Sequence, residues 1–302
     1  MRDDLIGYLA AEGFERELEL ELGDVSLRHG RLLLAPKPAR SAAWAQNLWL
    51  EPREMTFRSI GDAVRQLRIL GRNWSMYSVV EHRRSALIRE ALPYVAARPI
   101  APYSQLPRAP LGSFSLLDRN RMLVSARCSS PFPNGEARFQ EDHVGPPSRA
   151  YLKLWELFTL TGRWPSPGEL VLDLGSSPGG WTWALARLGA RVISVDKAPL
   201  DLRVAAMPGV EHRRVSAFAI SPQDMEDVSW VFSDLACYPG RLLGLVERWL
   251  AVPFASPPRM VCTIKFQGET DHGIAQRFAE IPGSRLLHLH HNRHELTWLC
   301  PG

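Results

Sequence analysis

Apolar and polar residues are most clearly patterned between residues 170 and 200, where two short apolar runs enclose a glycine-rich turn. The run 170–174 predicts a buried strand, residues 181–188 predict a helix, and the run 191–195 predicts a second strand. Two strands joined through a helix in this way are expected to lie parallel in one sheet. The rest of the chain is organised around this unit of strand, turn, helix and strand.

The second half of the chain continues to alternate strands with helices. A helix is predicted to open near residue 148, with Ser148 as its N-cap. The further predicted elements are strands at 211–217, 229–234, 259–264, 285–290 and 296–299 and a helix at 240–249. This order predicts the α/β class, with a Rossmann-like sheet over residues 148–302.

The first half predicts a smaller α+β domain over residues 1–127. Residues 4–23 predict an amphipathic helix that Gly13 shortens, because leucines recur there at roughly helical spacing. The other predicted elements are hairpins at 24–34 and 113–126, a strand at 44–50, helices at 60–70 and 79–94, and a proline-rich loop at 100–112. Residues 128–147 carry prolines and glycines without a clear period, and they are predicted to connect the two domains.

The composition is that of a soluble globular protein, with 45% hydrophobic and 23% charged residues. No apolar run reaches the roughly 18 residues that a membrane-spanning helix needs, and the first residues are too acidic for a signal or transit peptide. The four cysteines lack the C-x-x-C pairing typical of structural zinc sites. We therefore expect a cytoplasmic protein with reduced thiols.

Charge is distributed unevenly along the chain. Residues 25–138 carry 18 basic and seven acidic side chains, whereas residues 139–302 carry 16 basic and 17 acidic ones. A basic block of this size suggests a polyanionic partner, for which RNA is the leading candidate. The alternative is that these arginines are ordinary solvent-exposed residues on helix surfaces.

Lysine is rare in this chain. The basic residues are 32 arginines and only four lysines, namely Lys37, Lys153, Lys197 and Lys265. Arginine cannot lose its proton in a protein, so a chain this rich in arginine is expected to keep lysine where a proton acceptor is needed. Lys37 lies in a proline-rich stretch and resembles an ordinary loop residue.

The glycine turn and the acidic residue after the second strand predict an adenosine site. Glycines allow the backbone to approach a nucleoside, and an acidic residue about 20 positions later can accept both ribose hydroxyls. Asp196 occupies that position. The turn lacks the middle glycine of G-x-G-x-x-G, which disfavours a dinucleotide such as NAD.

The sequence D-L-G-x-x-P-G-G-W from Asp173 to Trp181 resembles motif I of S-adenosylmethionine methyltransferases, specifically the FtsJ-type RNA ribose 2′-O-methyltransferases. The resemblance implies S-adenosyl-L-methionine as cofactor. It implies the following cofactor-binding residues: Ser148, Gly175, Pro178, Gly179, Gly180, Trp181, Asp196, Ser216 and Asp234. Ser216 departs from the pattern, since the related family has an aspartate there.

The same resemblance implies a catalytic tetrad. The segment S-R-A-Y-L-K-L supplies Lys153, the end of a predicted strand supplies Asp234, and the T-I-K-F segment supplies Lys265. Glu295 completes the set at the start of the last strand. Lys265 is expected to be the general base, with Lys153 as the neighbouring cation, and no metal is expected to take part.

The first half resembles the THUMP-like part of the bacterial large-subunit ribosomal RNA methyltransferase M family, through residues 13–15 and 48–54. This implies RNA capture by the first domain. The candidate phosphate contacts are Arg53, Arg58, Arg65, Arg68 and Arg72. Trp44, Trp49 and Trp74 are expected in the core or at a domain interface rather than as platforms on which bases stack.

The histidine-rich stretch 288–294 could form a zinc site or a basic rim facing RNA, and the basic rim is the preferred interpretation. The leading functional hypothesis is 2′-O-methylation of a cytidine in large-subunit ribosomal RNA. Two alternatives stay open: a 2′-O-methyltransferase of transfer RNA or a messenger cap, and a non-catalytic factor that binds S-adenosylmethionine and RNA.

Overall fold

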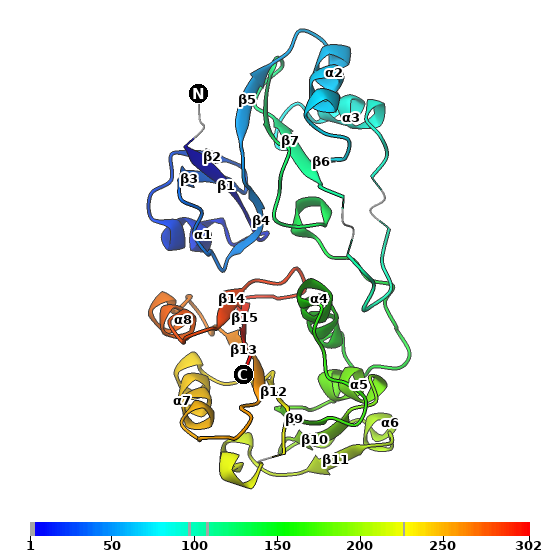
Figure 1. The fold of residues 1–302 in the computed structure, drawn as a ribbon, viewed down its shortest axis with the longest axis vertical. Helices are drawn as coiled ribbons and strands as arrows, with labels where there is room; N and C mark the ends of the chain where they lie inside the picture. The colour runs from blue at the N-terminus through cyan, green and yellow to red at the C-terminus, as the bar shows by residue number, and fades with distance from the viewer. Residues whose placement is uncertain (1–3, 96–97, 107–108, 226) are drawn as a thin grey trace. The chain divides into compact units, whose positions relative to one another are not determined.

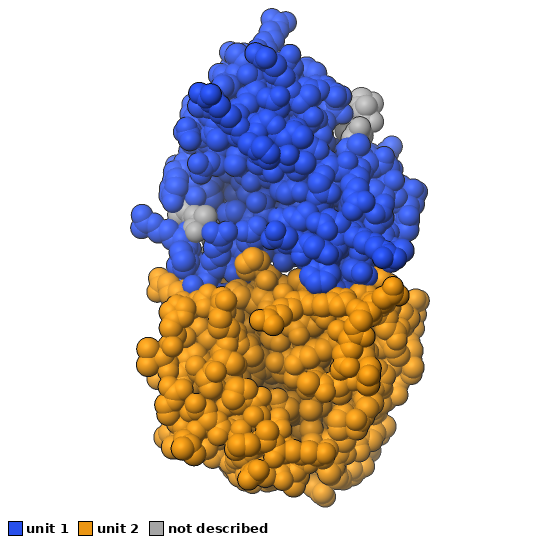
Figure 2. Space-filling model, turned by 180° about the vertical axis from the view of Figure 1, so that it is seen from behind, with its two compact units in different colours: residues 1–139 blue, residues 140–302 orange. Residues whose placement is uncertain are grey.

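The computed structural model describes residues 4–95, 98–106, 109–225 and 227–302. The chain divides into two compact units, Met1–Phe139 and Gln140–Gly302, which are drawn in Figure 1 and coloured separately in Figure 2. This division falls inside the segment 128–147, which the sequence predicts as a connection. Each unit is described by itself below.

The first unit begins with a four-stranded antiparallel sheet in the order β2-β3-β1-β4. Its elements are β1 (Leu5–Ala10), α1 (Glu15–Leu22), β2 (Leu27–His29), β3 (Leu32–Pro36) and β4 (Ala45–Trp49). The pairing of β2 with β3 confirms the hairpin predicted over residues 24–34.

The predicted helix over residues 4–23 is wrong in its first half. Leu5–Ala10 forms β1, which lies between β3 and β4 and has five of its six residues buried. A strand buried on both faces shows no alternation of polar and apolar residues, so its leucines could be read as one side of a helix. Gly13, with a φ of +82°, separates this strand from α1.

The second sheet of the first unit has the order β5-β8-β7-β6. Its elements are β5 (Arg53–Thr56), β6 (Trp74–Met76), β7 (Gly112–Leu116) and β8 (Arg121–Ser125), together with α2 (Ile60–Leu70), α3 (His82–Ala91) and η1 (Pro133–Gly135). Helix α2 has the predicted bounds, whereas α3 is shorter than predicted. Side chains of α2 and α3 pack with those of the sheet in one apolar cluster. Trp44, Trp49 and Trp74 are buried, which confirms their predicted place in the core.

The second unit contains a seven-stranded sheet in the order β11-β10-β9-β12-β13-β15-β14. The strands are β9 (Leu170–Leu174), β10 (Arg191–Val195), β11 (Val210–Arg213), β12 (Trp230–Ser233), β13 (Arg259–Lys265), β14 (Arg285–Leu287) and β15 (Glu295–Cys300). The five strands from β11 to β13 are parallel, and β15 is antiparallel to both of its neighbours. The carboxyl ends of the parallel strands therefore share one edge, where such sheets build their sites.

Helices cover both faces of this sheet, with α4 and α5 on one side and α7 and α8 on the other (Figure 1). The elements are α4 (Tyr151–Thr161), α5 (Gly180–Arg187), α6 (Leu202–Ala205), η2 (Ala217–Ala219), η3 (Pro222–Asp224), α7 (Pro239–Leu250) and α8 (His272–Ala279). Helices α6 and α8 were not predicted. Among the described residues, no helix combines the length and apolarity needed to cross a membrane.

Two local predictions in the second unit are wrong. Ser148 is not the N-cap of α4, because Ala150 holds that position and no side chain caps the helix. The third strand, β11, ends at Arg213, so Ser216 lies beyond it and precedes η2.

Candidate active site

Four charged side chains meet at the edge of the sheet in the second unit. Lys153 comes from α4, Asp234 directly follows β12, and Lys265 is the last residue of β13. Glu295 opens β15 and lies opposite Lys265 in the antiparallel register. The topology therefore gathers residues that lie far apart along the chain, as the resemblance implies for a tetrad.

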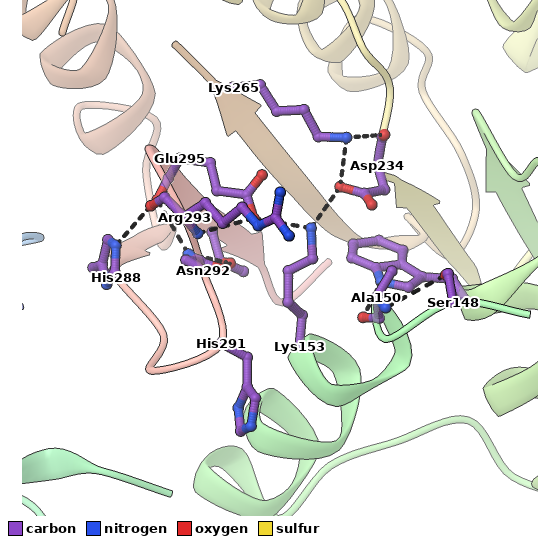
Figure 3. Close-up of polar contacts among 12 residues, drawn as sticks. Ser148, Ala150, Lys153, Asp234, Lys265, His288, His291, Asn292, Arg293 and Glu295 are labelled. Atoms are coloured by element: carbon purple, nitrogen blue, oxygen red, sulfur yellow. Dashed lines mark hydrogen bonds and ion pairs between the residues drawn. The ribbon is translucent and has the colours of Figure 1, made fainter. Parts of the chain in front are cut away.

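The contacts within this tetrad are short (Figure 3). Lys153 Nζ lies 2.9 Å from Asp234 Oδ1 and 3.0 Å from Glu295 Oε1. Lys265 Nζ lies 3.1 Å from the same Asp234 oxygen and donates a hydrogen bond of 2.6 Å to the Asp234 carbonyl. One carboxylate oxygen of Asp234 thus lies between the two amines.

The two lysines differ in environment. The Lys153 side chain is 9% exposed, whereas the Lys265 side chain is 26% exposed. Burial by itself would lower the pKa of Lys153, but the charges and hydrogen bonds of Asp234 and Glu295 outweigh it and raise that pKa above its usual value. Lys153 is therefore a fixed ammonium ion at neutral pH.

Helix α4 is buried along residues 151–159, which include two charged side chains, Lys153 and Glu156. A buried charge needs partners, and those of Glu156 lie in the segment 288–294, which we call the histidine segment. The carboxylate of Glu156 accepts hydrogen bonds from the backbone N–H of His290 at 2.8 Å and of His291 at 3.1 Å. His291 Nδ1 lies 2.7 Å from Glu156 Oε2. Sequence reasoning missed Glu156, although a glutamate three residues after Lys153 in an apolar helix was a usable signal.

His288 does not contribute charge to the basic rim that the sequence predicts for this segment. His288 is buried, and burial lowers its pKa to about 4, so its ring is neutral at pH 7. Its Nε2 atom lies 2.9 Å from the carbonyl oxygen of Arg293. A zinc site in this segment gains no support, since the described residues include no group of three or more His, Cys, Asp or Glu able to hold a metal ion.

The glycine turn has the backbone that its sequence predicts. Gly175 and Gly179 have φ angles of +79° and +116°, which other residues rarely adopt. At Gly180 a Cβ atom would come within 2.4 Å of Ser148 Oγ, so the segment before α4 packs directly on the turn. Trp181 continues this contact, since its indole N–H donates to the carbonyl of Ala150 at 2.9 Å.

The turn is also tied to Asp196, which follows β10. The Asp196 carboxylate accepts hydrogen bonds from the backbone N–H of Ser177 at 3.1 Å and of Ala198 at 2.9 Å. Pro178, between the turn glycines, follows a cis peptide bond. Ser216 is half-buried beyond β11, and its predicted contact with adenine stays a prediction.

A buried chain of hydroxyl groups lies beneath the turn and was not predicted. Thr182 Oγ1 donates to Asp173 Oδ2 at 2.6 Å and lies 3.2 Å from Ser194 Oγ, which donates to Ser176 Oγ at 2.7 Å. Asp173 is fully buried, and burial raises its pKa to about 7 despite the opposing hydrogen bond from Thr182. This chain links β9, α5 and β10 to the turn.

Comparison with known proteins identifies the domain that carries this site. Residues 146–275 match the family model described as FtsJ-like methyltransferase. The match confirms, for these residues, the resemblance drawn from motif I and the Rossmann-like α/β fold. It also supports S-adenosyl-L-methionine as the methyl donor of such a domain.

Several curated relatives carry the same name, "Ribosomal RNA large subunit methyltransferase M". The protein of Halorhodospira halophila is 39% identical over 127 residues, covering 41% of this chain and 37% of the relative. That of Azoarcus sp. is 33% identical over 185 residues, covering 57% of this chain and 50% of the relative. The chain thus matches half or less of the length of these two relatives.

Among solved structures, TrmN from Thermus thermophilus aligns with 98% of each chain at 14% identity. The TM-score of 0.37 is too low to support any further argument.

Proposed function

We propose that this chain, whose residues 146–275 are an FtsJ-like methyltransferase domain, transfers the methyl group of S-adenosyl-L-methionine to a ribose 2′-hydroxyl of RNA. The substrate that we infer is a cytidine of large-subunit ribosomal RNA, in the cytoplasm. The relatives that bear the name of a large-subunit ribosomal RNA methyltransferase support this choice of RNA.

The meeting of two amines and two carboxylates beside the glycine turn is the observation that carries the proposal. A ribose hydroxyl is a poor nucleophile and must give up its proton as it attacks. Lys265 is the proposed base, because its side chain is the more exposed of the two lysines and a substrate can reach it. The carbonyl and carboxylate of Asp234 hold the Lys265 amine in place, at 2.6 and 3.1 Å.

Lys153 has a different proposed role. Its ammonium group contacts both Asp234 and Glu295, so it fixes the orientation of the two carboxylates rather than exchanging a proton itself. Glu295 in turn keeps Lys153 charged. Most of the remaining rate acceleration would come from holding the reacting groups in line.

S-adenosyl-L-methionine supplies an electrophilic methyl group when it is bound. The turn fits such a ligand, because Gly175 and Gly179 have positive φ angles that only glycine adopts readily and Asp196 lies at the adjacent strand end. The proposed cofactor contacts are Ser148, Gly175, Pro178, Gly179, Gly180, Trp181, Asp196, Ser216 and Asp234.

For the first unit we propose RNA capture by a THUMP-like domain. Of its five candidate arginines, Arg53 pairs with Glu51, Arg65 pairs with Asp62, and Arg68 donates to a backbone carbonyl. The side chains of the other two, Arg58 and Arg72, have no partner in the described part of the chain. These two arginines are therefore the stronger candidates for phosphate contacts.

The direct test is to incubate the protein with labelled S-adenosylmethionine and total RNA, and then to digest each RNA class to nucleosides. We expect labelled 2′-O-methylcytidine from large-subunit ribosomal RNA, and none with Lys265→Ala, which should still bind the cofactor. Label in transfer RNA or messenger caps would favour the first alternative. Cofactor binding without any transfer to RNA would favour a non-catalytic RNA-binding factor.

A further inference from the structure

We propose that Arg293 forms a phosphate-binding subsite, which contacts the RNA phosphate next to the ribose to be methylated. This inference deepens the proposed function and rests on it for the identity of the RNA. Three observations support it. The histidine segment is anchored by hydrogen bonds, the Arg293 side chain has no ion pair or hydrogen bond among the described residues, and this side chain extends toward the tetrad (Figure 3).

The first anchor of the histidine segment is the Glu156 carboxylate. Glu156 is only 2% exposed, and it accepts backbone hydrogen bonds from His290 and His291 as well as the contact from the His291 ring. A buried carboxylate is costly unless it is fully hydrogen-bonded, so this arrangement strongly favours one position of the segment against α4.

The second anchor lies at Arg293 itself. The neutral His288 ring donates from Nε2 to the Arg293 carbonyl, and the backbone N–H of Glu295 donates to the same carbonyl at 2.8 Å. The buried Asn292 side chain donates to the carbonyl of Glu295 at 3.2 Å and to the hydroxyl of Thr297 at 3.1 Å. Hydrogen bonds therefore hold the backbone at Arg293 itself and the side chain of the residue before it, Asn292.

The Arg293 side chain, in contrast, is exposed, and its guanidinium has neither an ion pair nor a hydrogen bond among the residues that the structure describes. Glu295 lies two residues away, but its carboxylate is engaged by Lys153. Some exposed arginines of this unit pair with a nearby carboxylate, as Arg149 does with Glu141 through two hydrogen bonds of 2.7 and 3.0 Å. Arg293 is thus a cation on a fixed backbone that the protein leaves uncompensated.

The direction of the Arg293 side chain indicates which kind of ligand it binds. In Figure 3 the Arg293 side chain extends from the histidine segment toward the tetrad residues Lys153 and Glu295. In RNA the carbon that bears the 2′-hydroxyl is bonded to the carbon that bears the 3′-phosphate, so a phosphate accompanies the reacting oxygen. A guanidinium presents paired N–H groups that match two phosphate oxygens. Arg293 would therefore fix the ribose relative to Lys265.

The test compares Arg293→Ala and Arg293→Lys with Arg285→Ala, the matched control. Arg285 is also exposed and lies on β14, but it pairs with Leu299, at the other end of β15 from Glu295. The probe is large-subunit ribosomal RNA transcribed in vitro, and binding is measured over a series of salt concentrations. We expect Arg293→Ala to weaken RNA binding about tenfold and to reduce the slope of log affinity against log salt by about 0.7 to 0.9. Arg293→Lys should keep the slope but recover only part of the affinity.

The affinity for S-adenosylmethionine should not change in any of these variants, which separates a phosphate contact from a general disturbance of the site. Equal RNA affinities and salt slopes for Arg293→Ala and Arg285→Ala would overturn the proposal. Methyl transfer by the unsubstituted chain is measured in parallel. If transfer is absent while Arg293→Ala still weakens RNA binding, the proposed function is wrong and the phosphate subsite stands.

Discussion

The two units place their ion pairs in different surroundings. In the first unit, Arg121 pairs with Glu54 at 2.9 Å while half of the arginine side chain is exposed. In the second unit, Lys153 is 9% exposed and its carboxylate partners, Asp234 and Glu295, are 16% and 10% exposed. The pairs have similar lengths, so the difference lies in how much water can reach them.

This difference decides what each pair can contribute. Exposed pairs are screened by water and add little to stability, whereas a buried pair loses much of its gain to desolvation and is weak evidence for stability. Buried, perturbed titratable groups gather instead at functional sites. The comparison therefore directs attention to the sheet edge of the second unit, and four substitutions can test it.

Lys153→Met is expected to have the largest effect. It leaves the buried Glu295 without its cation and removes one of the two amines beside Asp234, and breaking a buried pair in this way typically costs about 3 to 5 kcal/mol. We expect the free energy of unfolding, measured in urea, to fall by about that amount. Methyl transfer should fall at least about 100-fold. A variant as stable as the unsubstituted chain would mean that the charges are not buried as described.

Asp173→Asn should change how stability depends on pH. Because burial raises the pKa of Asp173 to about 7, the folded protein keeps a proton that the unfolded chain releases near pH 4. The stability of the unsubstituted chain relative to the variant should therefore fall by about 1.4 kcal/mol for each pH unit between about pH 4 and pH 7. Above about pH 7 the difference should be constant. Unfolding measured at pH 5, 6 and 8 checks the sign, and a relative stability that rises with pH would contradict it.

Glu156→Gln should have a smaller effect on stability, of about 1 to 3 kcal/mol, because one acceptor becomes an N–H group facing the backbone N–H groups of His290 and His291. If Glu156 positions the histidine segment, the variant should also raise the KM for RNA more than the affinity for S-adenosylmethionine changes. The matched control is Glu247→Gln, which removes an exposed carboxylate paired with Arg277. Identical kinetics for the two variants would remove Glu156 from any positioning role.

Arg121→Met should have the smallest effect. This arginine contacts Glu54 and Asp118, but all three side chains remain in contact with water. We expect the midpoint of unfolding in urea to stay within experimental error of that of the unsubstituted chain. The substitution is thus the exposed counterpart of Lys153→Met. A loss comparable with that of Lys153→Met would erase the contrast between the two units.

Where the sequence has a clear period, it predicted the fold well. Helix α2 and strands β9 and β10 have the predicted bounds, because each carries a pattern that matches its own period and ends at a recognisable turn. Strand β1 was missed because burial on both faces removes the alternation that marks a strand.

The site was predicted in part, and for a different reason. Lys153 lies 81 residues before Asp234 and 142 before Glu295, and no local pattern connects positions so far apart. Only the family resemblance brought them together in the prediction. Glu156 and the hydroxyl chain at Asp173 were missed because their meaning depends on which strands and segments pack against them.

The most direct measurement is methyl transfer by Lys265→Arg, made with labelled S-adenosylmethionine and large-subunit ribosomal RNA. Arginine keeps the positive charge and can still contact Asp234, but it cannot accept the proton of a ribose hydroxyl. We predict that this variant binds S-adenosylmethionine as the unsubstituted chain does and forms almost no 2′-O-methylated nucleoside. Transfer at the rate of the unsubstituted chain would show that Lys265 is not the base.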